Sequence, residues 1–367
     1  MRSYKMLFVM LLIHSYAVAS SSAMHDDLTP ELEALLESTE LPSLAVAVIL
    51  DGELRAAGAS GVRKRGAEDR VTIDDKYHIG SCTKSITAVL AATLVEAGKI
   101  TWETTLGQVF HDVNIHPAFA QVTLKQLLSN KSGCPTDINH ELWSRLWERE
   151  GTASQQRMQL VEGILSKPPE YTPGTETRYS NAGFAIAGAM LERVTETSFE
   201  RLLREKVFLK LGMESAGFGA PATLGKIDQP YGHNPNPVEP DERGDNPPAI
   251  APAGTVHCSV LDFARYAAFH LGQQTALALK PETLAFLHEP EMGYEAYWMG
   301  WTMVERDWAG GTALTHAGSN TMFYAIIWIA PERNFAVVAL CNSGGNEAFL
   351  LCDAAASQII KKYLPLE

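Results

Sequence analysis

Ser81 and Lys84, in the stretch YHIGSCTKSITAVL at 77–90, are the residues whose types and spacing could do chemistry. Serine is a weak nucleophile until a base removes its proton. In a helix, residues three apart share a face, so the lysine amine would reach the serine hydroxyl. The free N–H groups at a helix start favour a neutral lysine and could also hold an oxyanion. The pair therefore predicts a nucleophile with its base, and the alternative is a helix N-cap followed by a solvated lysine.

Two short motifs farther along the chain, at 179–181 and 316–318, could complete such a site. Beside a lysine ammonium, the phenol of Tyr179 would have a lowered pKa and could pass protons. Asn181 offers an amide donor and acceptor to a substrate amide, and Gly318 would let substrate backbone lie along an edge strand. The alternatives are a turn held by an Asx bond and, for His316, a surface histidine.

Other catalytic patterns are absent from the sequence. There is no G-x-S-x-G elbow, and neither His140-Glu141 nor His288-Glu289 is followed by the second histidine of a zinc hydrolase. The five cysteines, at 82, 134, 258, 341 and 352, show neither C-x-x-C spacing nor a zinc-like pairing with histidine. Their odd number leaves at least one thiol unpaired, and Cys82 is interpreted as a small packing residue. We expect no metal and no cofactor.

The elements that must position these residues follow from the hydrophobic pattern. Residues 43–58 read as a hairpin with an Asp-Gly turn, 75–80 as a short strand, and 82–97 as a helix stopped by Gly98. The region from about 100 to 225 is mostly helical by pattern, and the Pro- and Gly-rich segment 228–254 is a long loop, either a lid or a surface insertion. The later segments predicted as elements are a helix at 260–272, four strands at 297–305, 311–318, 323–332 and 334–344, and a closing helix at 346–364.

This order predicts an α+β fold, with an antiparallel sheet that is built from both chain ends and flanked by helices. We expect a sheet domain at 24–100 plus 251–367 and a largely helical insert at 101–250.

Composition limits the partners. The chain has 367 residues, a net charge of -13 and no basic block, which argues against nucleic acid and favours a small-molecule or peptide substrate. Residues 1–23 carry Arg2 and Lys5, an apolar run from Met6 to Ile13 and small residues up to Ala23, as in a secretory signal peptide. The apolar run is too short to span a bilayer. We therefore expect an exported protein, periplasmic or secreted, without stable membrane insertion, and its oligomeric state stays open.

In combination, the three motifs closely resemble the serine β-lactamase and penicillin-binding protein superfamily, and specifically its class C β-lactamase-like branch. S-x-x-K stands where a strand enters a helix, Tyr-x-Asn follows, and a basic residue-x-Gly lies on a late strand. The surroundings TLKQLLSNKSG, YTPGTETRYSNAGFAIAG and AGTVHCSVLDFARY are similar to those of that branch, so the resemblance covers nearly the whole mature chain.

The resemblance implies a role for each matching residue. Ser81 would be the acylated nucleophile, Lys84 its activating partner, and Tyr179 a general base or proton relay, with the choice of base between Lys84 and Tyr179 open. Asn181 would contact the substrate amide. The backbone N–H groups of Ser81 and Ser319 would form the oxyanion hole. His316 and Gly318 would line the substrate site, and no metal or cofactor is implied.

The third motif departs from the family pattern, which is usually Lys-Thr-Gly. His316 replaces a permanent ammonium by an imidazole that is mostly neutral at pH 7, which weakens the case for an efficient β-lactamase. Histidine does occur at this place among D-amino-acid-specific peptidases of the branch. Three functions stay open: a hydrolase of a D-amino-acid peptide, a β-lactam or a related amide; an esterase of the family VIII kind; and a non-catalytic binder of cell-wall peptides. Retention of Ser81, Lys84 and Tyr179 together speaks against the binder.

Overall fold

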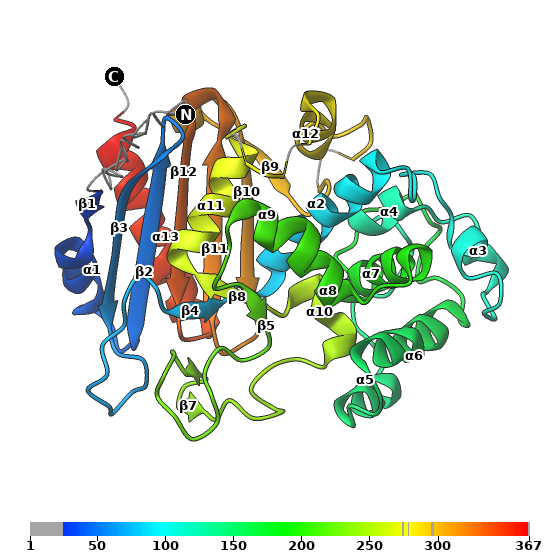
Figure 1. Cartoon of the computed structure of the whole chain (residues 1–367), viewed down its shortest axis with the longest axis horizontal. Helices are drawn as coiled ribbons and strands as arrows, with labels where there is room; N and C mark the ends of the chain where they lie inside the picture. The colour runs from blue at the N-terminus through cyan, green and yellow to red at the C-terminus, as the bar shows by residue number, and fades with distance from the viewer. Residues whose placement is uncertain (1–24, 274, 278, 295–296, 366–367) are drawn as a thin grey trace, which may run out of the picture.

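A mixed sheet built from both ends of the chain forms one half of the molecule (Figure 1). The computed structural model describes residues 25–273, 275–277, 279–294 and 297–365, so the predicted signal peptide at 1–23 lies outside the described residues. Within these ranges the sheet has seven strands in the order β1-β3-β2-β12-β11-β10-β9. Their bounds are β1 Asp26–Asp27, β2 Ser43–Leu50, β3 Glu53–Gly61, β9 Thr302–Arg306, β10 Gly311–Ser319, β11 Tyr324–Ala330 and β12 Phe335–Cys341.

The hairpin and its partner strand show why the two chain ends meet. Asp51 and Gly52 have φ values of 51° and 83°, the left-handed conformation that a two-residue hairpin turn requires. Strand β2 pairs antiparallel with β12, from Leu50 opposite Phe335 to Leu44 opposite Cys341. The predicted α+β fold with a helix-flanked sheet is therefore confirmed.

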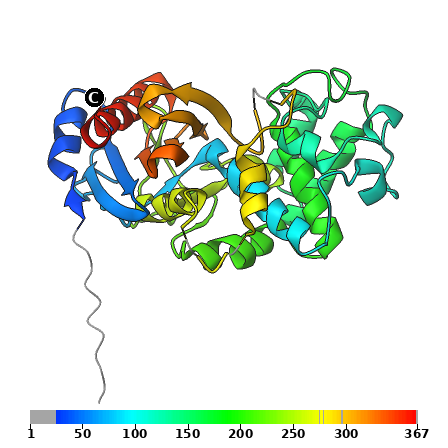
Figure 2. The same cartoon turned by 90° about the horizontal axis from the view of Figure 1, so that it is seen from above.

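Helices cover both faces of this sheet, as the view from above shows (Figure 2). Alternate residues of β12 point to opposite sides: Val337 and Ala339 lie on the side of α13 (Gly345–Tyr363), where α1 (Thr29–Leu36) also packs on the sheet. Val338 and Leu340 lie on the side of α11 (Val260–His270) and belong to the same core as α2 (Thr83–Glu96). Of the described helices, none combines the length and the apolar character needed to cross a membrane.

The other half of the molecule is helical, and α2 lies where the two halves meet (Figure 1). Three of its helices begin with a reciprocal capping box of the T-x-x-Q type, at Thr105, Thr123 and Thr152, so their start points are encoded locally. The helices are α3 Leu106–Val109, α4 Leu124–Leu128, α5 His140–Trp147, α6 Ala153–Leu165, α7 Asn181–Thr195, α8 Phe199–Leu203 and α9 Leu209–Leu211. The domain limits given above stay a prediction.

A second, smaller sheet was not predicted. Its order is β4-β8-β5, with β4 at Lys76–His78, β8 at Val256–Ser259 and β5 at Gly217–Phe218. The predicted strand before Ser81 thus pairs with β8 and lies outside the large sheet. The segment 228–254, predicted as a loop, carries the short pair β6 Gly232–His233 and β7 Pro237–Val238 and ends in a 3-10 turn, Pro248–Ile250, followed by α10 Ala251–Gly254. Helix α12 Pro281–His288 precedes β9.

Candidate active site

Ser81 lies in a tight 3-10 turn, Gly80–Cys82, that joins β4 to α2. Gly80 has a φ of +50°, and a Cβ added there would lie 2.2 Å from the backbone N of Ser319, so glycine lets this turn approach the end of β10. Neither the turn nor α2 has a side-chain cap in the described structure. The Ser81 hydroxyl instead faces Lys84 and Tyr179, and the N-cap alternative is wrong.

Lys84 is completely buried, one helical turn after Ser81. Its Nζ lies 3.0 Å from Ser81 Oγ, 2.7 Å from Asn181 Oδ1 and 2.7 Å from the carbonyl oxygen of Ala253. Burial lowers the pKa of Lys84 well below its ordinary value. A neutral amine has two N–H groups, which the two acceptors Asn181 Oδ1 and Ala253 O can take, and one lone pair, which is then left for the Ser81 hydroxyl.

Tyr179 approaches Ser81 from the helical half. Its hydroxyl donates to Ser81 Oγ at 2.5 Å, and Lys84 Nζ lies 4.6 Å from the centre of its ring. Desolvation raises the pKa of Tyr179 to about 12, and the hydrogen bond to Ser81 opposes this shift. The expectation that a lysine ammonium lowers the pKa of this phenol is wrong, because burial disfavours the ammonium form of Lys84 itself.

The start of α7 fixes Tyr179 and Asn181 on either side of a capping serine. The hydroxyl oxygen of Ser180 accepts from the backbone N–H of Gly183. The backbone N–H of Ser180 donates to Asn130 Oδ1. Ser180 Oγ also donates to the carbonyl of Pro135 at 2.6 Å. With Ser180 held at three points, the residues before and after it are directed toward Lys84.

Gly318 brings the end of β10 against the Ser81 turn. A Cβ on Gly318 would lie 2.1 Å from the carbonyl oxygen of Ile79 and 2.7 Å from the backbone N of Ser81. Strand β9 pairs with β10 only as far as Thr315, so in the described structure 316–319 has no neighbouring strand on that side. The backbone of the Ser81 turn therefore lies against the backbone at Gly318 and Ser319, next to the edge of β10 that β9 does not cover.

His316 is buried and its two ring nitrogens have partners within the protein. Nδ1 lies 2.6 Å from the carbonyl oxygen of Ala317, and Nε2 lies 3.0 Å from the hydroxyl of Tyr297. Burial first, and then the nearby Lys84, lower the pKa of His316 to about 3. The imidazole is thus neutral at pH 7, with Nδ1 donating to the carbonyl and Nε2 accepting from Tyr297. The surface-histidine alternative is wrong.

Two groups that contact the candidate site could not be predicted from the sequence. The Lys84 acceptor on Ala253 is a backbone carbonyl, and Tyr297 meets His316 only through tertiary packing. The thiol of Cys82 is buried, lies 3.6 Å from the His316 carbonyl and has a raised pKa because of burial, as expected for a packing residue. The five cysteines are all buried and free.

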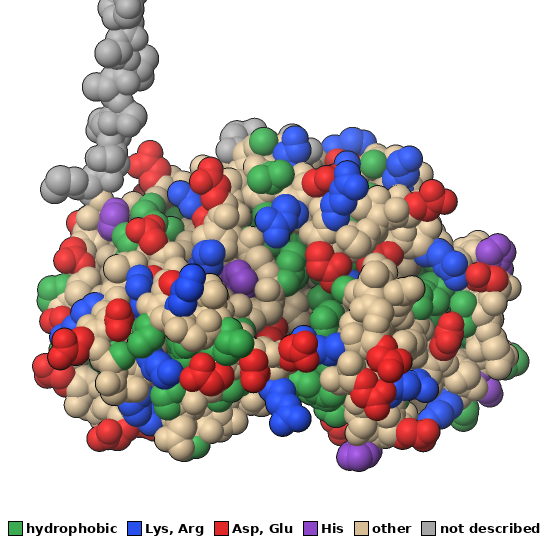
Figure 3. All heavy atoms as spheres, turned by 60° about the horizontal axis from the view of Figure 1, so that its bottom comes forward, with side chains coloured by type: hydrophobic (Ala, Val, Ile, Leu, Met, Phe, Trp, Pro, Cys, Tyr) green, Lys and Arg blue, Asp and Glu red, His purple; other side chains and the backbone are tan. Residues whose placement is uncertain are grey.

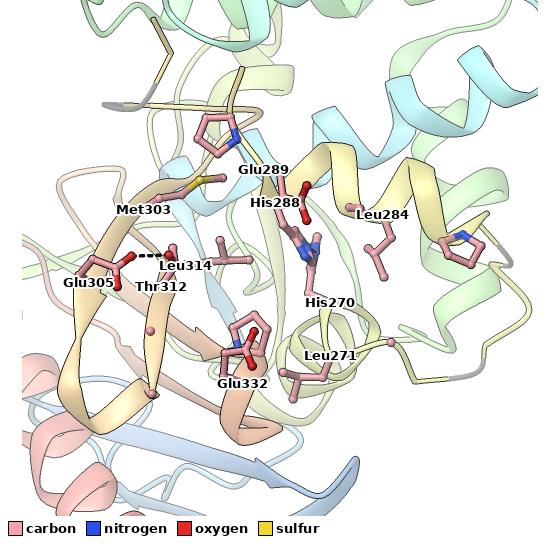
Figure 4. Close-up of a pocket in the computed structure, with 17 residues that line it drawn as sticks. His270, Leu271, Leu284, His288, Glu289, Met303, Glu305, Thr312, Leu314 and Glu332 are labelled. Carbon is pink, nitrogen blue, oxygen red and sulfur yellow. Dashed lines mark hydrogen bonds between the residues drawn. The ribbon is translucent and has the colours of Figure 1, made fainter. Parts of the chain in front are cut away.

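A cavity of about 900 Å³ lies apart from Ser81, between α11, α12 and the strands β9 and β10 (Figure 4). His270 and His288 lie side by side in it, with Nδ1 of the first 2.7 Å from Nε2 of the second. Among the described residues, no group of three or more His, Cys, Asp or Glu is arranged to hold a metal ion.

The surface between the two halves is indented and mixed in charge (Figure 3). Acidic and basic side chains alternate over the face shown, without a continuous basic patch.

Comparison with known proteins identifies the family. The β-lactamase family model matches residues 29–359, so the chain belongs to this family. It is 26% identical to penicillin-binding protein 4 of Amycolatopsis lactamdurans over 86% of this chain and 85% of that protein. It is 25% identical to the unguisins hydrolase ungD' of Aspergillus campestris over 88% of this chain, and it spans 62% of that longer protein.

Solved structures show the same fold. The octameric penicillin-binding protein homologue from Pyrococcus abyssi matches with a TM-score of 0.74 at 23% identity, over 92% of this chain and 79% of the other. SurE matches with a TM-score of 0.73 at 20% identity, over 90% of this chain and 74% of the other. The predicted resemblance to β-lactamases and penicillin-binding proteins is confirmed.

Proposed function

We propose that the protein is a serine hydrolase that forms an acyl-enzyme on Ser81 and acts on an amide such as a D-amino-acid peptide or a β-lactam. One observation carries this proposal: the Ser81 hydroxyl lies between a desolvated lysine amine at 3.0 Å and a tyrosine hydroxyl at 2.5 Å. A serine held this way is activated for attack on a carbonyl. The family and the curated hydrolase relative support the same reaction class.

In this proposal Lys84 is the base. The lowered pKa of Lys84 favours its neutral amine, which has a lone pair to take the Ser81 proton, whereas the raised pKa of Tyr179 keeps the phenol protonated. As Ser81 Oγ attacks, its proton moves to Lys84 Nζ, and the backbone N–H groups of Ser81 and Ser319 stabilise the oxyanion. Tyr179 then passes a proton to the leaving group and is reprotonated from Lys84. Water hydrolyses the acyl-enzyme by the same route in reverse.

Asn181 and the open edge of β10 bind the substrate in this proposal. The Asn181 carbonyl oxygen accepts from Lys84, so its amide N–H₂ group is left to meet a substrate carbonyl. Residues 316–319 offer backbone groups on the side that β9 leaves unpaired.

An esterase of the family VIII kind is the second candidate, and one observation favours it. His316 is neutral and bonded to Tyr297, so this position has no cation for a substrate carboxylate. Substrates without a free carboxylate would then be preferred over penicillins. A role as a non-catalytic binder does not need a desolvated lysine beside Ser81.

The test is turnover by the mature protein and by its Ser81→Ala variant, with a p-nitrophenyl ester and a fluorescent penicillin. We expect the wild type to hydrolyse the ester and to be labelled by the penicillin, and Ser81→Ala to do neither. Activity that survives in Ser81→Ala would move the reaction to another residue, and a wild type inert toward both reagents would favour the binder.

A further inference from the structure

Asp245, from the loop 228–254, is buried between the two backbone turns that flank the proposed oxyanion hole. It is 4% exposed. Its Oδ1 lies 2.9 Å from Nε2 of His78 and accepts a hydrogen bond of 3.1 Å from Nδ2 of Asn320. His78 precedes the Ser81 turn, and Asn320 directly follows Ser319. One carboxylate oxygen therefore contacts both sides of the site.

On the first side, His78 ties the carboxylate to the Ser81 turn. The imidazole is completely buried, and its Nδ1 accepts from the backbone N–H of Gly80 at 3.1 Å. A neutral imidazole that accepts at Nδ1 carries its proton on Nε2, the atom facing Asp245. The Nε2–H does not point at Oδ1 of Asp245, so the carboxylate acts on this N–H mainly through its charge. The charge favours the tautomer in which Nδ1 accepts from the Gly80 N–H. Gly80 directly precedes Ser81 in the chain.

On the second side, Asn320 ties the carboxylate to the turn after β10. Its Oδ1 accepts from the backbone N–H groups of Met322 and Phe323 at 3.2 Å and 3.0 Å. Its Nδ2 donates to Asp245, which fixes the direction of the amide. The turn that carries Ser319 is therefore held by the same carboxylate.

The loop is fixed from outside by the helical half. Arg149 donates to the carbonyl oxygen of Asp245 at 2.8 Å, and it also contacts the carbonyls of Glu242 and Asn246. Asp245 Oδ2 is buried without a hydrogen-bond partner among the described residues. A buried carboxylate with an unpaired oxygen costs stability, so a purely structural role explains it poorly.

We propose that Asp245 is a positioning residue that aligns the backbone N–H groups of Ser81 and Ser319 as one oxyanion hole. This inference rests on the proposed acyl-enzyme at Ser81. Removing the charge leaves His78 free to change tautomer and Asn320 free to turn, so the two N–H groups lose their common geometry. The loss falls on the transition state, because the oxyanion develops only there.

The test compares Asp245→Asn with the wild type on a p-nitrophenyl ester, with rates normalised to titrated active sites. We expect kcat to fall about 10- to 100-fold while KM changes by no more than about twofold. Affinity for phenylboronic acid, whose tetrahedral adduct places an oxygen in the oxyanion hole, should fall by a similar factor. A merely structural residue would lower the number of active sites and leave both values per site unchanged.

Two further variants keep the result decisive. Glu192→Gln removes another buried carboxylate, paired with Arg157 in the helical half, and should lower the Tm with kcat per site unchanged. Arg149→Ala loosens the loop without touching the buried side chain, so kcat and boronate affinity should fall together, by less than in Asp245→Asn. If Asp245→Asn does not fold, an unchanged kcat in Arg149→Ala overturns the inference.

The outcomes separate this inference from the function it rests on. Wild-type activity in Asp245→Asn, with an inactive Ser81→Ala, would overturn the positioning role alone. Activity retained in Ser81→Ala would overturn the acyl-enzyme and the positioning role with it.

Discussion

At the scale of single residues, burial acts in opposite directions on the pKa values of the two groups that contact Ser81, Lys84 and Tyr179. The choice of base depends on the carbonyl of Ala253, which takes one N–H of Lys84 and was invisible in the sequence. It also depends on desolvation, which lowers the pKa of Lys84 and raises that of Tyr179. In the proposed mechanism, these features make Lys84 the base and keep Tyr179 protonated.

Replacing Lys84 tests its lowered pKa. The unfolded chain binds a proton on this lysine up to its ordinary pKa near 10.5, whereas the folded protein releases it at lower pH. Wild-type stability therefore decreases as the pH falls from about 10 toward 7, and Lys84→Met lacks this decrease. We expect the Tm of the wild type minus that of Lys84→Met to become more negative as the pH falls from about 10 toward 7.

Thermal unfolding at pH 7, 8.5 and 10 measures this difference. Ser81→Ala keeps the lysine and serves as the control that should follow the wild type. A difference between wild type and Lys84→Met that stays constant with pH would refute the lowered pKa.

At the scale of elements, the candidate site lies where the Ser81 turn closely approaches the end of strand β10. The hairpin 43–58 and the helix at 82–97 could be predicted, because periodicity and turn residues encode them locally. Strand β8 could not, because four residues directly before a helical pattern give no clear alternation, and the small sheet that carries β4 was missed with it. Pairing between distant short strands is set by tertiary packing.

The variant Gly318→Ala tests the approach of β10 to the Ser81 turn. The added methyl group would meet the backbone of Ile79 and Ser81 at 2.1 Å and 2.7 Å, and backbone cannot move aside as a flexible side chain can. We expect kcat/KM for an ester to fall about 100-fold or more, at a cost of about 1–3 kcal/mol in stability.

The matched control is Gly107→Ala, whose methyl would meet the carbonyl oxygen of Ala120 at 2.9 Å in the helical half. It should lose stability with kcat/KM per active site unchanged. Equal activity in Gly318→Ala and the wild type would show that the strand does not need this close contact.

At the scale of the whole molecule, net charge and motif order predicted the class of protein, whereas burial of the histidines became visible only in the structure. Burial lowers the pKa of the histidines 233, 257, 270, 288 and 316 among the described residues. Their unfolded forms take up protons below about pH 6.5, but the folded forms do so only at lower pH. Folding stability is therefore lost as the pH falls through this window.

Denaturation with guanidinium chloride at pH 7.5 and 5.5 measures this loss. We expect the free energy of unfolding to be a few kcal/mol lower at pH 5.5, since each such histidine adds up to about 1.4 kcal/mol per pH unit. The variant His288→Gln should reduce the difference, and His111→Gln, at a histidine that is 79% exposed, should not. Equal stability at the two pH values would contradict the burial of these imidazoles as neutral groups.

Intact mass of the protein after a short exposure to a p-nitrophenyl ester or a penicillin, followed by peptide mapping, tests whether Ser81 is acylated. The proposed acyl-enzyme predicts a mass increase equal to the acyl group, located on the peptide that contains Ser81 and absent from Ser81→Ala. An adduct on another residue, or steady turnover with the same adduct in Ser81→Ala, would contradict it.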